Sequence, residues 1–113
     1  METKASIRYL KMSPRKVRVV ADLVRGRNVG DAIRTLTFVK RAAAEPVRKV
    51  IESAVANARQ ADSAIDVDAL YIKSLMVDMG PTGNMRRWRP RAQGRATRVV
   101  KGLSHISVVL DIR

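Results

Sequence analysis

The sequence predicts an α+β fold in which three amphipathic helices accompany three strands. Its 113 residues, of which 46% are hydrophobic, fit one compact domain with a modest core. Apolar residues recur at helical spacing in three stretches of the first 61 residues. Three other segments, residues 3–11, 67–78 and 103–112, alternate with a period of two or are rich in strand-forming residues.

The first strand leads directly into the first helix. Its alternation is expected to place three residues on one side of the strand: Ala5, Ile7 and Tyr9. The Ser13 hydroxyl can cap free backbone N–H groups, and Pro14 suits the first helical position. The helix is expected to run to about Val24 and to stop at Gly26. It carries one apolar face: Val17, Val20, Ala21 and Val24.

Two further helices come next along the chain. A helix over about 30–39 is expected to turn Ile33, Leu36 and Val39 inward. A longer helix over about 43–61 tolerates Pro46 because that residue lies in its first turn. Its apolar stripe contains six residues: Val47, Val50, Ile51, Ala54, Val55 and Ala58.

Two strands are expected after residue 62, with Asp66 and Asp68 as turn residues before the first. Residues 67–78 are rich in Val, Leu, Ile and Tyr. Residues 103–112 alternate more cleanly and are expected to share one face among four residues: Ile106, Val108, Leu110 and Ile112.

Residues 80–101, here called the arm, form the most unusual segment. The arm is too long for an ordinary hairpin turn of about 2–5 residues and too polar to fold on itself. It is either disordered alone or a ribbon in which the flanking strands continue outward. With about 12 residues per strand, such a ribbon would reach roughly 40 Å. A two-stranded ribbon is marginal in water, so this one makes sense if a polyanion surrounds it.

The charge of the chain also indicates a polyanion as its partner. The chain carries 23 Lys and Arg against 10 Asp and Glu, a formal net charge of +13, which attracts polyanions. Arginine outnumbers lysine by 16 to 7, and its planar guanidinium suits phosphate and can stack on bases. The arm contributes seven cations and no acidic residue: Arg86, Arg87, Arg89, Arg91, Arg95, Arg98 and Lys101. Binding that neutralises several phosphates should weaken steeply with salt.

Two further features have both a functional and a plainer interpretation. Trp88 either stacks on an unpaired base or packs on side chains of the ribbon itself. The first helix and its approach carry a second basic patch, which either contacts phosphates or is simply solvated: Lys11, Arg15, Lys16, Arg18 and Arg25. His105, the only histidine, is expected to pack within its strand or to contact RNA.

Other classes of function find little support. The chain has no cysteine and one histidine, so a zinc site is implausible and no metal or cofactor is expected. No nucleophile–base pair or phosphate-binding glycine loop is present, which argues against an enzyme with a small-molecule substrate. Residues 1–11 lack the apolar core of a signal peptide, and no apolar run approaches a membrane span, so a cytoplasmic protein is expected. A helix-turn-helix in residues 13–39 of a regulatory DNA- or RNA-binding module is the main alternative, but it leaves the arm unexplained.

Several segments stand out in order along nearly the whole chain: SPRKVR at 13–18, DLVRG at 22–26, ESA at 52–54 with ANA at 56–58, VDMGP at 77–81, PRAQGRA at 90–96 and SHISVV at 104–109. Together they resemble one known family, that of bacterial ribosomal protein L-twenty-two of the large subunit.

The resemblance implies an α/β (α+β) fold, with three helices packed on a small antiparallel sheet and a long protruding β-hairpin. Residues 1–113 would form a single RNA-binding domain, with 80–101 as its basic extended hairpin. The body would bind large-subunit ribosomal RNA beside neighbouring ribosomal proteins and support subunit assembly. The hairpin tip would line the peptide exit tunnel, near the ribosomal protein L-four, and meet the nascent peptide. The residues that the resemblance assigns to this tip are Met85, Arg86, Arg87, Trp88, Arg89, Pro90, Arg91 and Gly94.

Overall fold

The computed structural model describes residues 2–80, 86–90, 96–100 and 103–112, with side chains in the first and last of these ranges. The elements occur in the order β1 (Thr3–Leu10), α1 (Pro14–Val24), α2 (Val29–Phe38), α3 (Ala44–Ala61), the 3-10 helix η1 (Val67–Ala69), β2 (Leu70–Met79), β3 (Arg86–Pro90), β4 (Ala96–Val100) and β5 (Ser104–Ile112).

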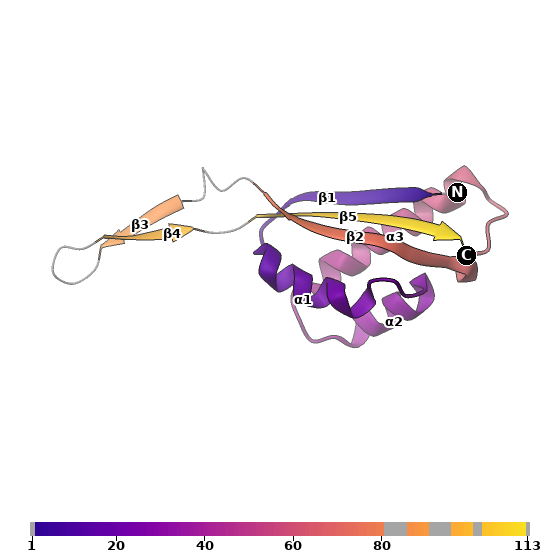
Figure 1. Ribbon diagram of the computed structural model, residues 1–113, viewed down its shortest axis with the longest axis horizontal. Coiled ribbons are helices and arrows are strands. Elements are labelled where there is room, and N and C mark those ends of the chain that lie inside the picture. Colours follow the sequence, from indigo (N-terminus) through magenta and orange to yellow (C-terminus); the bar gives the residue numbers. More distant parts are fainter. Residues whose placement is uncertain (1, 81–85, 91–95, 101–102, 113) are drawn as a thin grey trace.

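Two antiparallel sheets organise these strands. The larger sheet has the order β1-β5-β2, so the last strand of the chain is its central one. The smaller sheet contains β3 and β4 and lies beyond one end of the larger sheet (Figure 1). The α+β fold, with three helices on a small antiparallel sheet and a protruding hairpin, is thereby confirmed. Residues 2–79 and 103–112 together are called the body, to distinguish them from the arm.

Helix α1 begins and ends where the sequence predicts. The Ser13 hydroxyl accepts a hydrogen bond from the Lys16 N–H at 3.5 Å, and Pro14 occupies the first turn. Gly26, with φ 81°, lies just past the helix end in the left-handed region that glycine adopts without steric cost. All four residues of the predicted apolar face are buried: Val17, Val20, Ala21 and Val24.

Helices α2 and α3 complete the layer that covers the sheet. In α2, Leu36 is buried, and Ile33 and the adjoining Val39 are partly buried against the core. Val29 and Ala32 are also buried in this helix, although they were not among the predicted residues. In α3, all six predicted residues are buried: Val47, Val50, Ile51, Ala54, Val55 and Ala58.

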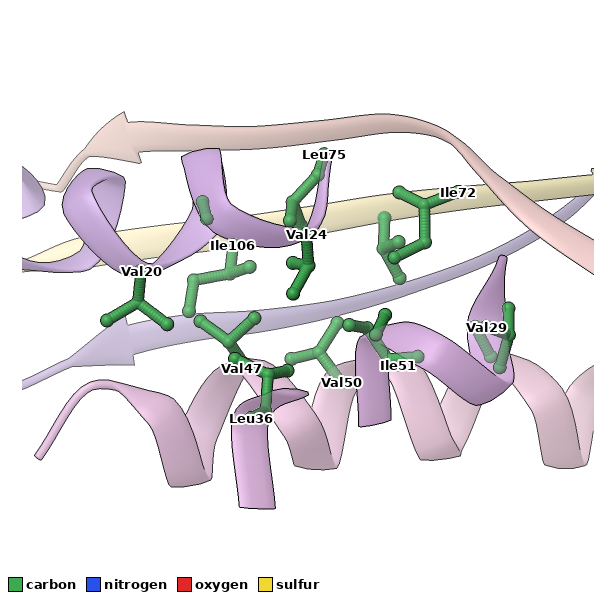
Figure 2. Close-up of a cluster of buried hydrophobic side chains, with 14 of the residues drawn as sticks. Val20, Val24, Val29, Leu36, Val47, Val50, Ile51, Ile72, Leu75 and Ile106 are labelled. Atoms are coloured by element: carbon green, nitrogen blue, oxygen red, sulfur yellow. The ribbon is translucent and has the colours of Figure 1, made fainter. Parts of the chain in front are cut away.

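The core lies between the three helices and one face of the larger sheet. Side chains from α1, α2 and α3 meet side chains of β2 and β5 there (Figure 2). In β5, Ile106, Val108 and Leu110 are buried as predicted, whereas Ile112 at the strand end is 40% exposed. The pairing of Ile112 with the buried Leu70 and of Leu110 with the buried Ile72 agrees with the predicted shared face, and Ile112 is exposed because it ends the strand.

The first residues expected in the strand after residue 62 form a short 3-10 helix instead. Val67–Ala69 make up η1, and β2 begins only at Leu70. The Asp66 side chain accepts a hydrogen bond from the Asp68 N–H at 3.0 Å, which confirms these two as turn residues. An irregularity between Ile72 and Ser74 then adds one residue to β2, so that both Ile72 and Leu75 face the core.

A second irregularity changes the direction of side chains at the end of β1. Between Ile7 and Leu10 the register advances three residues in β1 against two in β5, from Ile106 to Ser104. One extra residue reverses the alternation beyond it. Leu10 therefore packs against the core, and Tyr9, which was predicted to lie beside Ala5 and Ile7, is 59% exposed.

Candidate nucleic-acid interface

The arm contributes a two-stranded ribbon to the structure. Strands β3 and β4 are antiparallel, with Arg86 opposite Val100 and Trp88 opposite Arg98. Arg87, Arg89 and the tip residue Pro90 also lie in this ribbon. Five predicted site residues are outside the described part of the chain: Met85, Arg91, Gly94, Arg95 and Lys101.

A main-chain hydrogen bond ties the base of the arm to the body, and a side-chain bond beside it joins the start of β5 to the segment between β1 and α1. The Gly80 N–H donates to the Leu103 carbonyl at 2.7 Å, which closes the ladder between β2 and β5. The Ser104 hydroxyl donates to the Met12 carbonyl at 2.5 Å. A Cβ on Gly80 would lie only 3.0 Å from the Leu103 Cβ and 3.3 Å from a ring carbon of His105. The two points where the chain leaves the body and returns to it, Gly80 and Leu103, therefore lie in close contact.

The basic patch predicted on the first helix is present at the surface. Lys11, Arg15, Lys16, Arg18 and Arg25 are all exposed residues. Within the described ranges, the first three take part in no ion pair, so their charges are available to a ligand. The spacing of these residues in the sequence thus produced the exposed cationic surface that was expected.

Arg18 and Arg25 have a second role that the sequence did not reveal. The Arg18 guanidinium donates to the Val77 carbonyl from Nε at 3.2 Å and from Nη2 at 3.0 Å. The Arg25 guanidinium donates to the Leu75 carbonyl from Nε at 3.1 Å and from Nη2 at 2.8 Å. Its Nη1 also bonds the carboxylate of Asp22.

These bonds protect a sheet edge. β2 is an outer strand of the larger sheet, and unpaired carbonyls on such a strand are a template for pairing with another chain. Arg18 of α1 and Arg25, just past the end of α1, occupy two of those carbonyls and hold the helix against the strand. Contact of Arg18 and Arg25 with RNA stays a prediction, and it would have to use the guanidinium surfaces that these bonds leave open.

His105 is fixed by its neighbour across the sheet. Its Nδ1 accepts a hydrogen bond from the Tyr9 backbone N–H at 3.0 Å. The two rings meet edge to face, with centroids 5.0 Å apart and an interplanar angle of 88°. Packing of His105 is thereby confirmed, and its contact with RNA stays a prediction. The role of Tyr9 could not be predicted because nothing in the alternation marks the extra residue in β1.

Most acidic residues on the helices are engaged in local ion pairs. Asp31 pairs with Arg34 at 3.8 Å, and Glu45 pairs with Lys49 at 3.2 Å. On β2, the Lys73 ammonium bonds the Glu2 carboxylate and so holds the pKa of Glu2 below its ordinary value. These anions offset body cations close to them, whereas the arm has no acidic residue of its own.

The described residues also bear on two other kinds of function. None of their helices is long and apolar enough to cross a membrane. None of their His, Asp and Glu side chains gather in a group of three or more that could hold a metal ion.

Comparisons with known proteins agree on one family. A family model described as ribosomal protein L22p/L17e matches residues 5–111. The chain is 53% identical to the large ribosomal subunit protein uL22 of Sorangium cellulosum over 113 residues, covering 100% of this chain and 99% of the relative. It is also 53% identical to proteins of the same name from Bdellovibrio bacteriovorus, with 98% of each chain covered, and from Myxococcus xanthus, with 97% and 96% covered.

Proposed function

Because the chain belongs to the ribosomal protein L22p/L17e family, whose members are structural proteins of the large ribosomal subunit and not enzymes, we propose that it acts by binding large-subunit ribosomal RNA. The protein works as a single RNA-binding domain within the cytoplasmic ribosome. RNA folds around it during assembly, and neighbouring ribosomal proteins pack beside it.

One observation carries the proposal: charge is separated between the two parts of the molecule. All 10 acidic residues lie outside the arm, while the arm holds seven cations. A polyanion is the partner that such a segment fits, because binding releases the counterions condensed on the phosphates. The arm arginines and Lys101 contact phosphates and sugars, as does the basic patch of Lys11, Arg15, Lys16, Arg18 and Arg25. Such contacts fix position without reading sequence.

The position of the ribbon supports a second element of the proposal. β3 and β4 lie beyond the end of the larger sheet, away from the helices that cover the core (Figure 1). A ribbon in that position can pass between RNA segments and present its tip, residues 85–95, to the wall of the peptide exit tunnel. The nascent peptide then passes the tip, whose sequence contains several Arg residues and Trp88.

A charge-removal series tests the RNA-binding role. Replacing Arg86, Arg87, Arg89 and Arg91 by Ala is expected to weaken binding of large-subunit ribosomal RNA. The slope of log affinity against log salt should fall in magnitude by about 3, since each phosphate contact contributes about 0.7 in single strands. Filter binding or fluorescence anisotropy across a salt titration measures both quantities.

The matched control removes the same number of charges from the body. Ala at Arg34, Arg41, Arg48 and Arg59 is expected to leave most of the salt slope in place. Equal losses in the two variants, or an unchanged slope in the arm variant, would contradict the proposed role of the arm. A tagged chain should also sediment with the large subunit in a sucrose gradient, and a regulator outside the ribosome would not.

A further inference from the structure

The larger sheet has one face that no helix covers. All three helices pack on the opposite face, where the buried residues of β1, β2 and β5 point. The uncovered face contains the alternate residues of the same strands: Lys4, Ser6, Arg8, Lys73, Met76, Asp78, His105, Ser107 and Val109. Open sheet faces with exposed aromatic rings are a recurring platform for single-stranded RNA.

Tyr9 stands at the end of this face that is nearest to the arm. It is 59% exposed, and its ring packs edge to face with the ring of His105, which is paired with Asp78 in β2. His105 in turn lies against Gly80, the first residue of the arm. The Tyr9 ring is therefore on the body but next to the point where the arm begins.

The backbone of Tyr9 is held in an unusual conformation. Its φ of 60° makes it the single non-glycine residue with positive φ in the described part of the chain. A tyrosine rarely adopts this region, because its Cβ crowds the following carbonyl. The bond from the Tyr9 N–H to His105 Nδ1 at 3.0 Å offsets part of that strain, and the edge-to-face contact with the His105 ring orients the Tyr9 ring. Strain of this kind clusters at sites of recognition.

We propose that the exposed Tyr9 ring, braced by His105, is a stacking platform for an unpaired base of the ribosomal RNA. This inference rests on the proposed function and assigns a base-contacting residue to the body in addition to the cationic arm. Arg8 and Lys11, the exposed cations on either side of Tyr9, bind the phosphates that flank the stacked nucleotide. Asp78, opposite His105, repels phosphate and so keeps the backbone of the RNA on the side of Arg8 and Lys11.

The surroundings favour RNA over a protein partner. Protein interfaces have cores depleted of charged residues, whereas Tyr9 has Arg8, Lys11, Asp78 and His105 near it. A base needs one flat aromatic surface with cations beside it, and that is what this end of the sheet offers.

The test compares two variants of the full chain, Tyr9→Gly and Tyr9→Phe. Glycine adopts a φ of 60° without steric cost, so Tyr9→Gly removes the ring while the backbone and its bond to His105 can persist. Binding of large-subunit ribosomal RNA by this variant is expected to weaken about 5- to 150-fold, the range for loss of one stacked base. The salt slope should stay that of the wild type, because stacking releases no counterions. Tyr9→Phe, which keeps the ring, is expected to bind within about twofold of the wild type.

The outcomes separate this inference from the proposed function. Equal affinity of Tyr9→Gly and the wild type would overturn the stacking platform and leave the arm's role intact. A wild-type chain that ignores the RNA would overturn both. Ultraviolet irradiation of assembled large subunits provides a second measurement that needs no variant. A nucleotide adduct on Tyr9, found by mass spectrometry, supports the platform, and a cross-link from Tyr9 to a neighbouring protein overturns it.

Discussion

The body and the arm differ in what stabilises them. The body buries apolar side chains from three helices and three strands in one core, and its acidic residues offset nearby cations. The arm has the opposite composition, with seven cations and no acidic residue in residues 80–101. Burial of apolar surface stabilises the body without a partner, whereas a cationic two-stranded ribbon is marginal in water. The body therefore provides stability, and the charge of the arm is suited to a partner.

Removal of the arm is the strongest test of this division. Gly80 and Leu103 already share a main-chain hydrogen bond, so an Asn-Gly turn can join them in place of residues 81–102. The shortened chain is expected to unfold at nearly the wild-type temperature. Its salt slope for ribosomal RNA should fall by about 5 in magnitude, since seven cations are lost. Thermal unfolding by circular dichroism and a binding titration measure the two effects, and a body that fails to fold would break the comparison.

A cavity in the body is expected to lower stability without changing the salt dependence of RNA binding, the opposite of removing the arm. Ile51 of α3 is fully buried between the helices and the sheet (Figure 2). Ile51→Ala is expected to lower the free energy of unfolding by about 2–5 kcal/mol, through lost burial and the cavity left behind. The salt slope for RNA should not change. Met76→Ala on the uncovered sheet face, where the side chain is 51% exposed, is the control and should change stability far less in urea denaturation.

Substitution of two glycines tests the close packing at the junction between body and arm. Gly80→Ala places a Cβ 3.0 Å from that of Leu103 and 3.3 Å from a backbone carbon, so it should destabilise the body by about 1–3 kcal/mol. Gly30→Ala, inside α2 with open space around it, should instead stabilise by about 0.5–1 kcal/mol. Chemical denaturation of both variants measures the two effects. Equal changes in the free energy of unfolding would mean that the space around Gly80 is not too tight for a Cβ.

The smallest expected loss of stability among these tests concerns Arg25, one of the two arginines with two candidate roles. Arg25→Ala removes two hydrogen bonds to the Leu75 carbonyl and should cost about 1–2 kcal/mol of stability. Arg25→Lys keeps the charge but loses the two-pronged bond, so it should recover RNA binding more fully than stability. If both variants kept wild-type stability in urea denaturation, the proposed protection of the β2 edge would be wrong.

Helix positions and the buried face of each helix could be predicted from the sequence because both depend on local spacing. The apolar residues of α1 and α3 recur at helical intervals. The ends of α1 are marked by the Ser13 hydroxyl and by the backbone preferences of Pro14 and Gly26. The cationic arm was equally clear, because the net charge of a segment depends on composition alone.

Only the tertiary structure decided where long-range partners lie. The extra residue in β1 turns Tyr9 outward, and it is defined by the register against β5, whose residues lie about a hundred positions away in the chain. The use of Arg18 and Arg25 on the β2 carbonyls likewise depends on how α1 packs beside β2. Periodicity and charge are properties of neighbours in sequence, whereas register and side-chain partners are set when distant segments pack together.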